Sequence, residues 1–177
     1  MGKINSRSKG KRGEKKARLV LAKWTSMEFA GVPASGGLRW KKADNITGDV
    51  ICIDPIHRFD FSIEVKNYRN INFEHLLMPN VQSDIMQVFW PQCIADSKRG
   101  KKIPLLMMRY DGIRPGDLFF VAMQYKVFKR LKHLLKGKAY PYLKYKQLVI
   151  MNSNVLFKSK YKKVKILTEK IIKETWS

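Results

Sequence analysis

The sequence predicts an α/β protein in which helices flank a central mixed β-sheet. The chain has 177 residues, of which 45% are hydrophobic, and this is enough for one domain with a buried core. One early segment spaces its apolar residues as a helix does, whereas three later segments have the length and composition of strands. The predicted order is helix, two strands, helix, strand.

The first predicted elements follow from local patterns. Residues 13–29 have apolar side chains at intervals of three and four, which predicts an amphipathic helix. Residues 31–37 are rich in Gly, Pro and Ser and are expected to form a loop. Residues 49–53 and 61–66 are predicted to be paired strands, with a turn at residues 57–60.

The next elements complete the sheet. Residues 80–97 are predicted to be partly helical, with Pro91 either kinking the helix or starting a second one. Gly100 is suited to the end of that helix. Residues 103–109 form an apolar run of strand length, which predicts a strand buried on both faces.

The charge of the chain predicts a polyanionic partner. Lys and Arg number 36 and Asp and Glu 14, which gives a formal net charge of +22. A folded protein with this excess is expected to bind nucleic acid, because each neutralised phosphate releases counterions.

Other classes of protein are disfavoured. The longest uncharged apolar runs are far shorter than the roughly 20 residues of a membrane span, and no apolar stretch follows the basic N-terminus as in a signal peptide. A cytoplasmic protein is therefore expected. Cys52 and Cys93 belong to no CxxC or Cys/His cluster, so both are expected to be buried free thiols.

The acidic residues are concentrated in one place. Five of the fourteen lie within 21 residues, between basic segments on either side: Asp44, Asp49, Asp54, Asp60 and Glu64. Carboxylates would weaken a surface that only coats phosphate, but a protein that cuts the backbone needs them to hold a divalent metal ion.

Strand alternation selects two of these carboxylates and one lysine. Glu64 and Lys66 fall on one face of their strand, and a hairpin could bring Asp49 close to Glu64. Two carboxylates can hold Mg²⁺ and activate a water molecule, while the lysine orients the nucleophile or offsets developing charge. The alternative is that Glu64 and Lys66 are ordinary solvated residues on the outer face of a hairpin.

Several motifs around these residues occur in a familiar order. They are Arg12-Gly13-Glu14, Pro33-Ala34-Ser35-Gly36, Gly48-Asp49, Glu64-Val65-Lys66 and the Gln-bearing segment 89–100 that runs into an apolar strand. In this order they resemble the PD-(D/E)XK nuclease superfamily and, within it, the archaeal-type Holliday junction resolvases, including phage-encoded relatives. Gly48 stands where the superfamily name leads one to expect proline, and the loop at residues 37–48 is longer than in compact members.

The resemblance implies a restriction-endonuclease-like core and a set of site residues. Asp49 and Glu64 would bind the metal, with the Val65 carbonyl as an additional candidate ligand, and Glu14 would complete the site directly or through water. Lys66 would be the catalytic lysine. Gln92 would lie on the helix that faces the metal, with Gln87 as an alternative. Mg²⁺ is the expected ion, and Mn²⁺ is expected to substitute for it.

The DNA-binding residues are expected on both sides of the acidic site. Ser35 would contact the scissile strand, and Trp40 would either stack on an exposed base or cover the core. The remaining candidates are cations that would seat the phosphate backbone: Lys9, Lys11, Arg12, Lys15, Lys16, Arg39, Lys41 and Lys42.

Together these features predict a Mg²⁺-dependent endonuclease of DNA recombination and repair that resolves four-way junctions. The resemblance implies a homodimer, in the host cytoplasm if the protein is virus-encoded. Residues 1–116 would form the nuclease core with its basic N-terminal arm, and residues 117–177 a basic C-terminal extension packed on it. The alternatives are a related nuclease acting on linear or flapped DNA and a non-catalytic basic nucleic-acid-binding protein.

Overall fold

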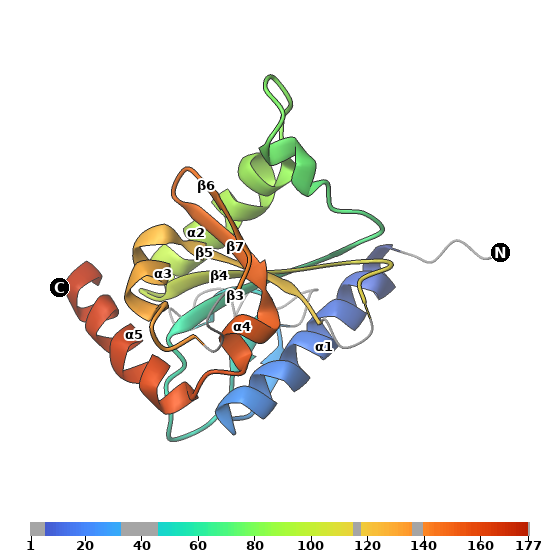
Figure 1. The fold of residues 1–177 in the computed structure, drawn as a ribbon. Coiled ribbons are helices and arrows are strands. Elements are labelled where there is room, and N and C mark those ends of the chain that lie inside the picture. The colour runs from blue at the N-terminus through green and yellow to red at the C-terminus, as the bar shows by residue number, and fades with distance from the viewer. Residues whose placement is uncertain (1–5, 33–45, 115–117, 136–139, 177) are drawn as a thin grey trace.

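A computed structural model describes residues 6–32, 46–114, 118–135 and 140–176 (Figure 1). It contains a seven-stranded sheet with the strand order β1-β2-β3-β4-β5-β7-β6, flanked by helices, which confirms the predicted α/β class. The strands are β1 (Phe29–Gly31), β2 (Val50–Cys52), β3 (Phe61–Tyr68), β4 (Ile103–Tyr110), β5 (Phe120–Gln124), β6 (Tyr142–Tyr145) and β7 (Leu148–Asn152). The helices are α1 (Ser6–Thr25), α2 (Trp90–Arg99), α3 (Tyr125–Leu131), α4 (Ser153–Phe157) and α5 (Tyr161–Trp176), with a 3₁₀ turn η2 (Phe73–Leu76) and a π turn η3 (Ile85–Phe89).

The sheet is mixed because its central pair is parallel. β3 and β4 pair in parallel from Phe61↔Ile103 to Tyr68↔Tyr110, and the other strand pairs are antiparallel. Parallel neighbours need a crossover, which η2, η3 and α2 provide. β4 is buried on both faces from Ile103 to Met108, as its uninterrupted apolar run predicts.

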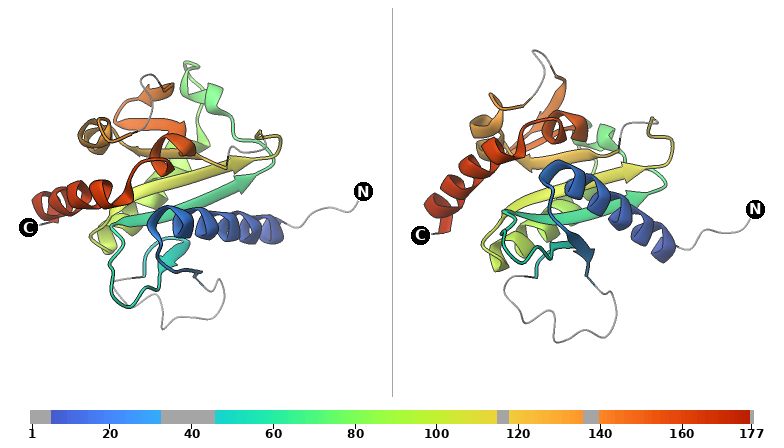
Figure 2. Two further views of the ribbon diagram at one scale, coloured as in Figure 1. Left: turned by 60° about the horizontal axis from the view of Figure 1, so that its bottom comes forward. Right: turned by 90° about the horizontal axis from the view of Figure 1, so that it is seen from below.

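Helices cover both faces of the sheet (Figure 2). On one face, a core cluster joins Leu21 of α1 and Ile63 of β3 with side chains of α3, α4 and α5. On the other face, Phe89 and Cys93 pack with Leu106, Met108 and neighbouring apolar residues. The central strands therefore lie between helices on both faces.

Several predicted boundaries differ from the observed ones. The helix predicted at residues 13–29 spans Ser6–Thr25, because residues 6–12 are mostly good helix formers that have no apolar pattern. It ends where Ser26 adopts a left-handed conformation with φ 63°, and Phe29 begins β1 instead. Pro91 lies in the first turn of α2, and Gly100 caps its end as predicted.

The two cysteines are free, as expected. Cys93 is buried in α2, as expected, but Cys52 is only partly buried. The expectation that both thiols are buried is therefore wrong for Cys52. Cys52 lies in the short strand β2, near one edge of the sheet, where less of the protein covers it.

The C-terminal third is built into the same sheet and core. Residues 118–176 contribute β5, β6, β7 and three helices, and Phe119, Val121 and Val164 belong to the cluster that contains Leu21. The two parts share one hydrophobic core. The division of the chain into a nuclease core at residues 1–116 and an extension at residues 117–177 stays a prediction.

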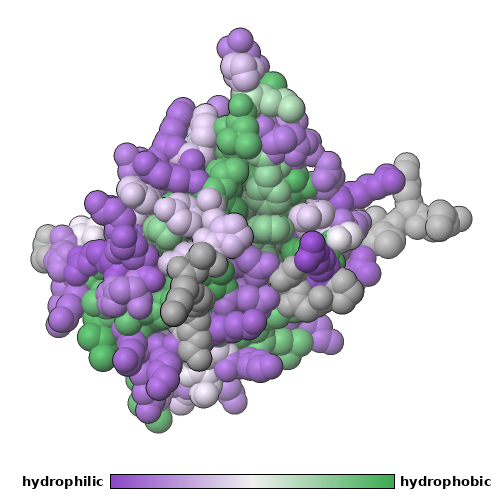
Figure 3. Space-filling view, in the orientation of Figure 1, coloured by the Kyte–Doolittle hydropathy of each residue, from purple (hydrophilic) through white to green (hydrophobic). Residues whose placement is uncertain are grey.

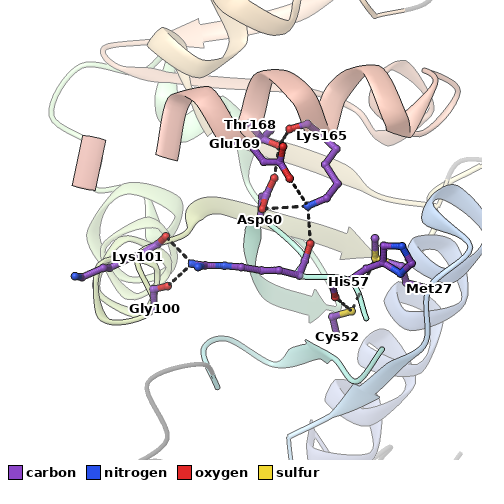
Figure 4. Close-up of polar contacts among 10 residues, drawn as sticks. Met27, Cys52, His57, Asp60, Gly100, Lys101, Lys165, Thr168 and Glu169 are labelled. Atoms are coloured by element: carbon purple, nitrogen blue, oxygen red, sulfur yellow. Dashed lines mark hydrogen bonds and ion pairs between the residues drawn. The ribbon is translucent and has the colours of Figure 1, made fainter. Parts of the chain in front are cut away.

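A polar network also ties α5 to the start of β3 (Figure 4). Asp60 is buried and accepts a hydrogen bond of 2.6 Å from the Thr168 hydroxyl. Lys165 lies 3.6 Å from the Asp60 carboxylate and donates to the Arg58 carbonyl at 2.8 Å. Arg58 in turn donates to the carbonyl of Lys101, two residues before β4 begins. The network holds the entry points of the two central strands together.

The surface matches the charge of the chain. Hydrophilic side chains dominate the face shown in Figure 3, with hydrophobic residues exposed between them. Within the described part of the chain, no helix is long and apolar enough to cross a bilayer.

Candidate active site

A glycine turn sets the position of Asp49 beside β3. Gly48 adopts φ +80° and bridges to Ile63, and a Cβ atom on it would lie 2.2 Å from the Ile63 carbonyl oxygen. Neither proline, whose φ is fixed near −65°, nor any other side chain fits there without a shift of the backbone. The Asp49 amide then donates to the Ile63 carbonyl at 2.7 Å, and its Oδ2 accepts from the Val65 amide at 2.8 Å.

Glu64 is a buried carboxylate with little compensation. Its side chain is 1% exposed, and Oε1 lies 2.7 Å from Lys66 Nζ. This distance is that of an ion pair, but neither carboxylate oxygen meets hydrogen-bond geometry with a donor among the described residues. Burial, followed by the charge of Asp49, raises the pKa of Glu64 to about 7.

Lys66 connects β3 to helix α2. Its Nζ donates to Gln92 Oε1 at 2.9 Å and lies 5.5 Å from the centre of the Phe89 ring. Burial lowers the pKa of Lys66, but the nearby carboxylates outweigh burial, so the pKa is raised and the amine stays protonated. Gln87 is exposed on η3 and makes no hydrogen bond to this group, so Gln92 is the glutamine that the fold brings to the lysine.

Glu14 approaches the same group from α1. Its Oε2 lies 3.4 Å from the position that a Cβ atom would occupy on Gly31, in the strand that pairs with β2. Burial and then the charge of Asp49 raise the pKa of Glu14, and Arg18 and Lys11 oppose the rise. Burial also raises the pKa of Asp49, and the hydrogen bond from Val65 opposes that rise. Asp49, just before β2, therefore interacts electrostatically both with Glu14 of α1 and with Glu64 of β3.

The residues fit a hard divalent cation. Among the described residues, no three His, Cys, Asp or Glu side chains form a ready-made metal group. Nevertheless, Lys66 is the cation paired with Glu64, and the neighbouring Asp49 adds a second negative charge, so two close carboxylates share one lysine. Neither oxygen of Glu64 meets hydrogen-bond geometry with a donor among the described residues. Carboxylate oxygens are the donors that Mg²⁺ prefers. The Val65 amide binds Asp49, which places the main chain of Val65 at the site.

The predicted DNA-binding residues divide into two groups. Lys11, Arg12, Lys15 and Lys16 are exposed on α1, and the partly buried Lys9 pairs with Asp111. The remaining candidates, Ser35, Arg39, Trp40, Lys41 and Lys42, lie outside the described residues.

Two residues near these cations were missed from the sequence. Asn67 donates to the Lys9 carbonyl at 2.8 Å, and Arg109 lines a cleft with the α1 cations. Asn67 directly follows the Glu-x-Lys motif and Arg109 pairs with it across the parallel strands, so a correct parallel register would have indicated both.

Comparisons with known proteins identify relatives. The profile of the family described as "Phage putative PDDEXK endonuclease" matches residues 5–174. The protein named Protein D14, from Escherichia phage T5, is 30% identical to the chain over 109 residues. The alignment covers 61% of this chain and 66% of that protein, just under two thirds of its length. No solved structure gives a significant match.

Proposed function

The chain belongs to this phage PDDEXK endonuclease family and is therefore a nuclease, and on this premise we propose that it is a Mg²⁺-dependent DNA endonuclease that resolves four-way junctions. The observation that carries the proposal is the buried Glu64 carboxylate, paired with Lys66 and close to the charge of Asp49. A stable surface hairpin has no need of such an arrangement, because a buried carboxylate costs stability even when one lysine pairs with it.

Each residue has a proposed part in phosphodiester hydrolysis. Asp49 and Glu64 would hold the cation, with the Val65 carbonyl as an additional candidate ligand and Glu14 acting directly or through water. A divalent cation at this point supplies Lewis-acid stabilisation of the phosphate and a more acidic water molecule. Lys66, protonated and positioned by Gln92, would offset the negative charge that develops on the phosphate.

The preference for four-way junctions is supported by the order of motifs and by the charge. The motifs that resemble the archaeal-type resolvases carry over to Glu14, Asp49, Glu64, Lys66 and Gln92. The exposed cations of α1 and the net charge of +22 would hold several phosphate backbones at once. A homodimer with two such sites would cut two strands symmetrically, and sedimentation of the protein with and without a junction tests this.

A substrate panel tests the function. Labelled four-way junction, duplex, flap and single strand would be incubated with the protein in Mg²⁺, in Mn²⁺ and in EDTA. We expect cleavage of the junction before the other substrates, and none in EDTA. Preferential cleavage of duplex or flap would instead assign the chain to a related nuclease that acts on linear or flapped DNA.

Variants test the site separately from binding. Asp49→Asn, Glu64→Gln and Lys66→Met are expected to abolish cleavage while junction binding in EDTA stays within about twofold of wild type. Glu74→Gln and Lys162→Met are matched controls, because both side chains are exposed and neither is among the charges that shift the pKa of Glu14, Asp49 or Glu64. Full activity of any of the three site variants in Mg²⁺ contradicts the assignment.

A further inference from the structure

Helix α1 carries different chemistry on its two flanks. Glu14 and Arg18 lie on the flank that faces β1 and Asp49. Lys9, Arg12 and Lys16 are spaced at three and four residues, so they lie on the other flank, with Lys23 two turns further on. From Lys9 to Lys23 this flank extends about 21 Å along the helix axis.

The first half of this flank borders a cationic cleft of about 320 Å³. Lys9, Arg12, Lys16 and Arg109 line it together with Asn67, and Asp111 is the only carboxylate among its described lining residues. Asp111 pairs with Lys9, and Arg109 donates to the Leu118 carbonyl at 2.8 Å. Four cations against one acid favour an anionic ligand, and phosphate is the anion that a nuclease meets.

The second half of the flank borders a groove of different character, with a volume of about 460 Å³. Its apolar lining comes from Leu19, Val20, Trp24, Leu118 and Phe157. Lys16, Lys23 and Lys158 also line this groove, and Lys16 lines the cleft as well, so the two hollows adjoin. Leu19 is 64% exposed, although burial of a leucine is normally favourable.

We propose that the cleft and the groove together bind single-stranded DNA, with phosphates in the cleft and at the lysines and unpaired bases on the apolar groove. This inference rests on the proposed function, because it names the part of a branched substrate that the enzyme holds beside the cut. A paired duplex presents phosphate and sugar on its outside, whereas an unpaired strand also exposes the apolar faces of its bases. The combination of cations and apolar surface therefore fits a single strand better than a duplex.

The path lies close to the candidate active site. The carboxylates and the cationic flank are on opposite sides of α1, a separation of about one helix diameter, roughly 10 Å. Asn67 in the cleft directly follows Lys66, and successive strand residues point to opposite faces of the sheet. An unpaired stretch at a branch point would thus be held on one side of α1 while the backbone is cut on the other.

Binding in EDTA tests the proposal without cleavage. The probes are a fluorescein-labelled thymidine strand of about ten nucleotides, an abasic strand of equal length and a blunt duplex. We expect wild type to bind the thymidine strand about tenfold more tightly than the abasic strand. Leu19→Glu should remove this preference for the thymidine strand. The added negative charge does not by itself change the preference, because it repels both strands alike.

Phosphate contacts have a separate signature. The double variant Arg12→Ala/Lys16→Ala should weaken the binding of both strands. It should also reduce the steepness of log affinity against log salt by about 0.7 per lost phosphate contact. Lys162→Ala/Lys163→Ala is the charge-matched control, because both lysines are exposed on α5 and neither lines the cleft or the groove. Its slope should change less than that of the first variant.

Equal binding of thymidine and abasic strands by wild type, or an unchanged preference in Leu19→Glu, overturns the proposal. Displacement of the strand by an acidic amphipathic peptide, with equal affinity for the two strands, assigns the groove to a protein partner and also overturns it. If the strand binds as expected but no substrate of the panel is cut, the proposed function fails and the binding path stands. The melting temperature of each variant confirms that it is folded.

Discussion

Replacing Glu64 by glutamine is expected to stabilise the metal-free protein, although the same change is expected to abolish cleavage. Burial and the charge of Asp49 raise the pKa of this carboxyl from 4.5 to about 7. The native state therefore prefers the protonated acid. Its contribution to stability is fully present below pH 4.5 and is lost as the pH rises towards 7.

The magnitude follows from the size of the pKa change. At about 1.4 kcal/mol per tenfold change in proton affinity, ionised Glu64 costs the folded state on the order of 3 kcal/mol at pH 8. For a chain of this length, Glu64→Gln should raise the melting temperature by up to about 6–12 °C. The attraction of Lys66 is already contained in this pKa, and in the variant Gln92 still accepts from that lysine.

Thermal and urea unfolding in EDTA at pH 4 and at pH 8 measure the effect. The variant and wild type should differ little at pH 4, and the difference should grow towards pH 8. Addition of Mg²⁺ at pH 8 should stabilise wild type but not the variant. A variant that is equally or less stable than wild type at pH 8, with the same dependence on pH, would refute the inference that the cost of burying the Glu64 charge exceeds what Lys66 compensates.

Three further changes test how the fold positions the site, each by thermal and urea unfolding. Gly48→Ala should destabilise the protein by more than about 3 kcal/mol. Gly112→Ala, with φ +85° but open space around its Cβ, should cost only about 1–2 kcal/mol. Equal losses would contradict the close approach of Gly48 to Ile63. Thr168→Val should cost about 1–3 kcal/mol because a buried carboxylate loses its donor, and Thr175→Val, which removes a bond to the backbone of its own helix, should cost less. A chain of residues 1–116 should show no cooperative unfolding, and a native-like transition would contradict a shared core.

The centre of the fold was predictable because its patterns are local. The alternation in residues 61–66 placed Glu64 and Lys66 on one face of a strand, and the uninterrupted apolar run at residues 103–109 indicated its buried neighbour. Which of Gln92 and Gln87 contacts Lys66 could not be predicted in the same way. It depends on η3, where a π turn changes the direction of the side chains just before α2.

The C-terminal strands were not predictable by these patterns. Residues 118–123 form an apolar run without alternation, which fits a buried strand and a buried helix equally well. The run becomes β5 because it pairs with both β4 and β7, contacts that are distant in sequence. Tyr142–Tyr145 lies at the edge of the sheet, where one neighbouring strand decides its conformation.

The shared core explains why the C-terminal third matters for the candidate site. Without residues 117–177, β4 would lose β5 as its neighbour and become an edge strand, although its side chains from Ile103 to Met108 are apolar on both faces. The start of β3 would lose Thr168 as the donor to Asp60, which would leave that buried carboxylate uncompensated. Because Glu64 and Lys66 lie on β3, between these two defects, their geometry depends on residues far outside the segment that carries the candidate catalytic motifs. The basic C-terminal segment thus supports the site through the sheet, whatever contact it makes with DNA.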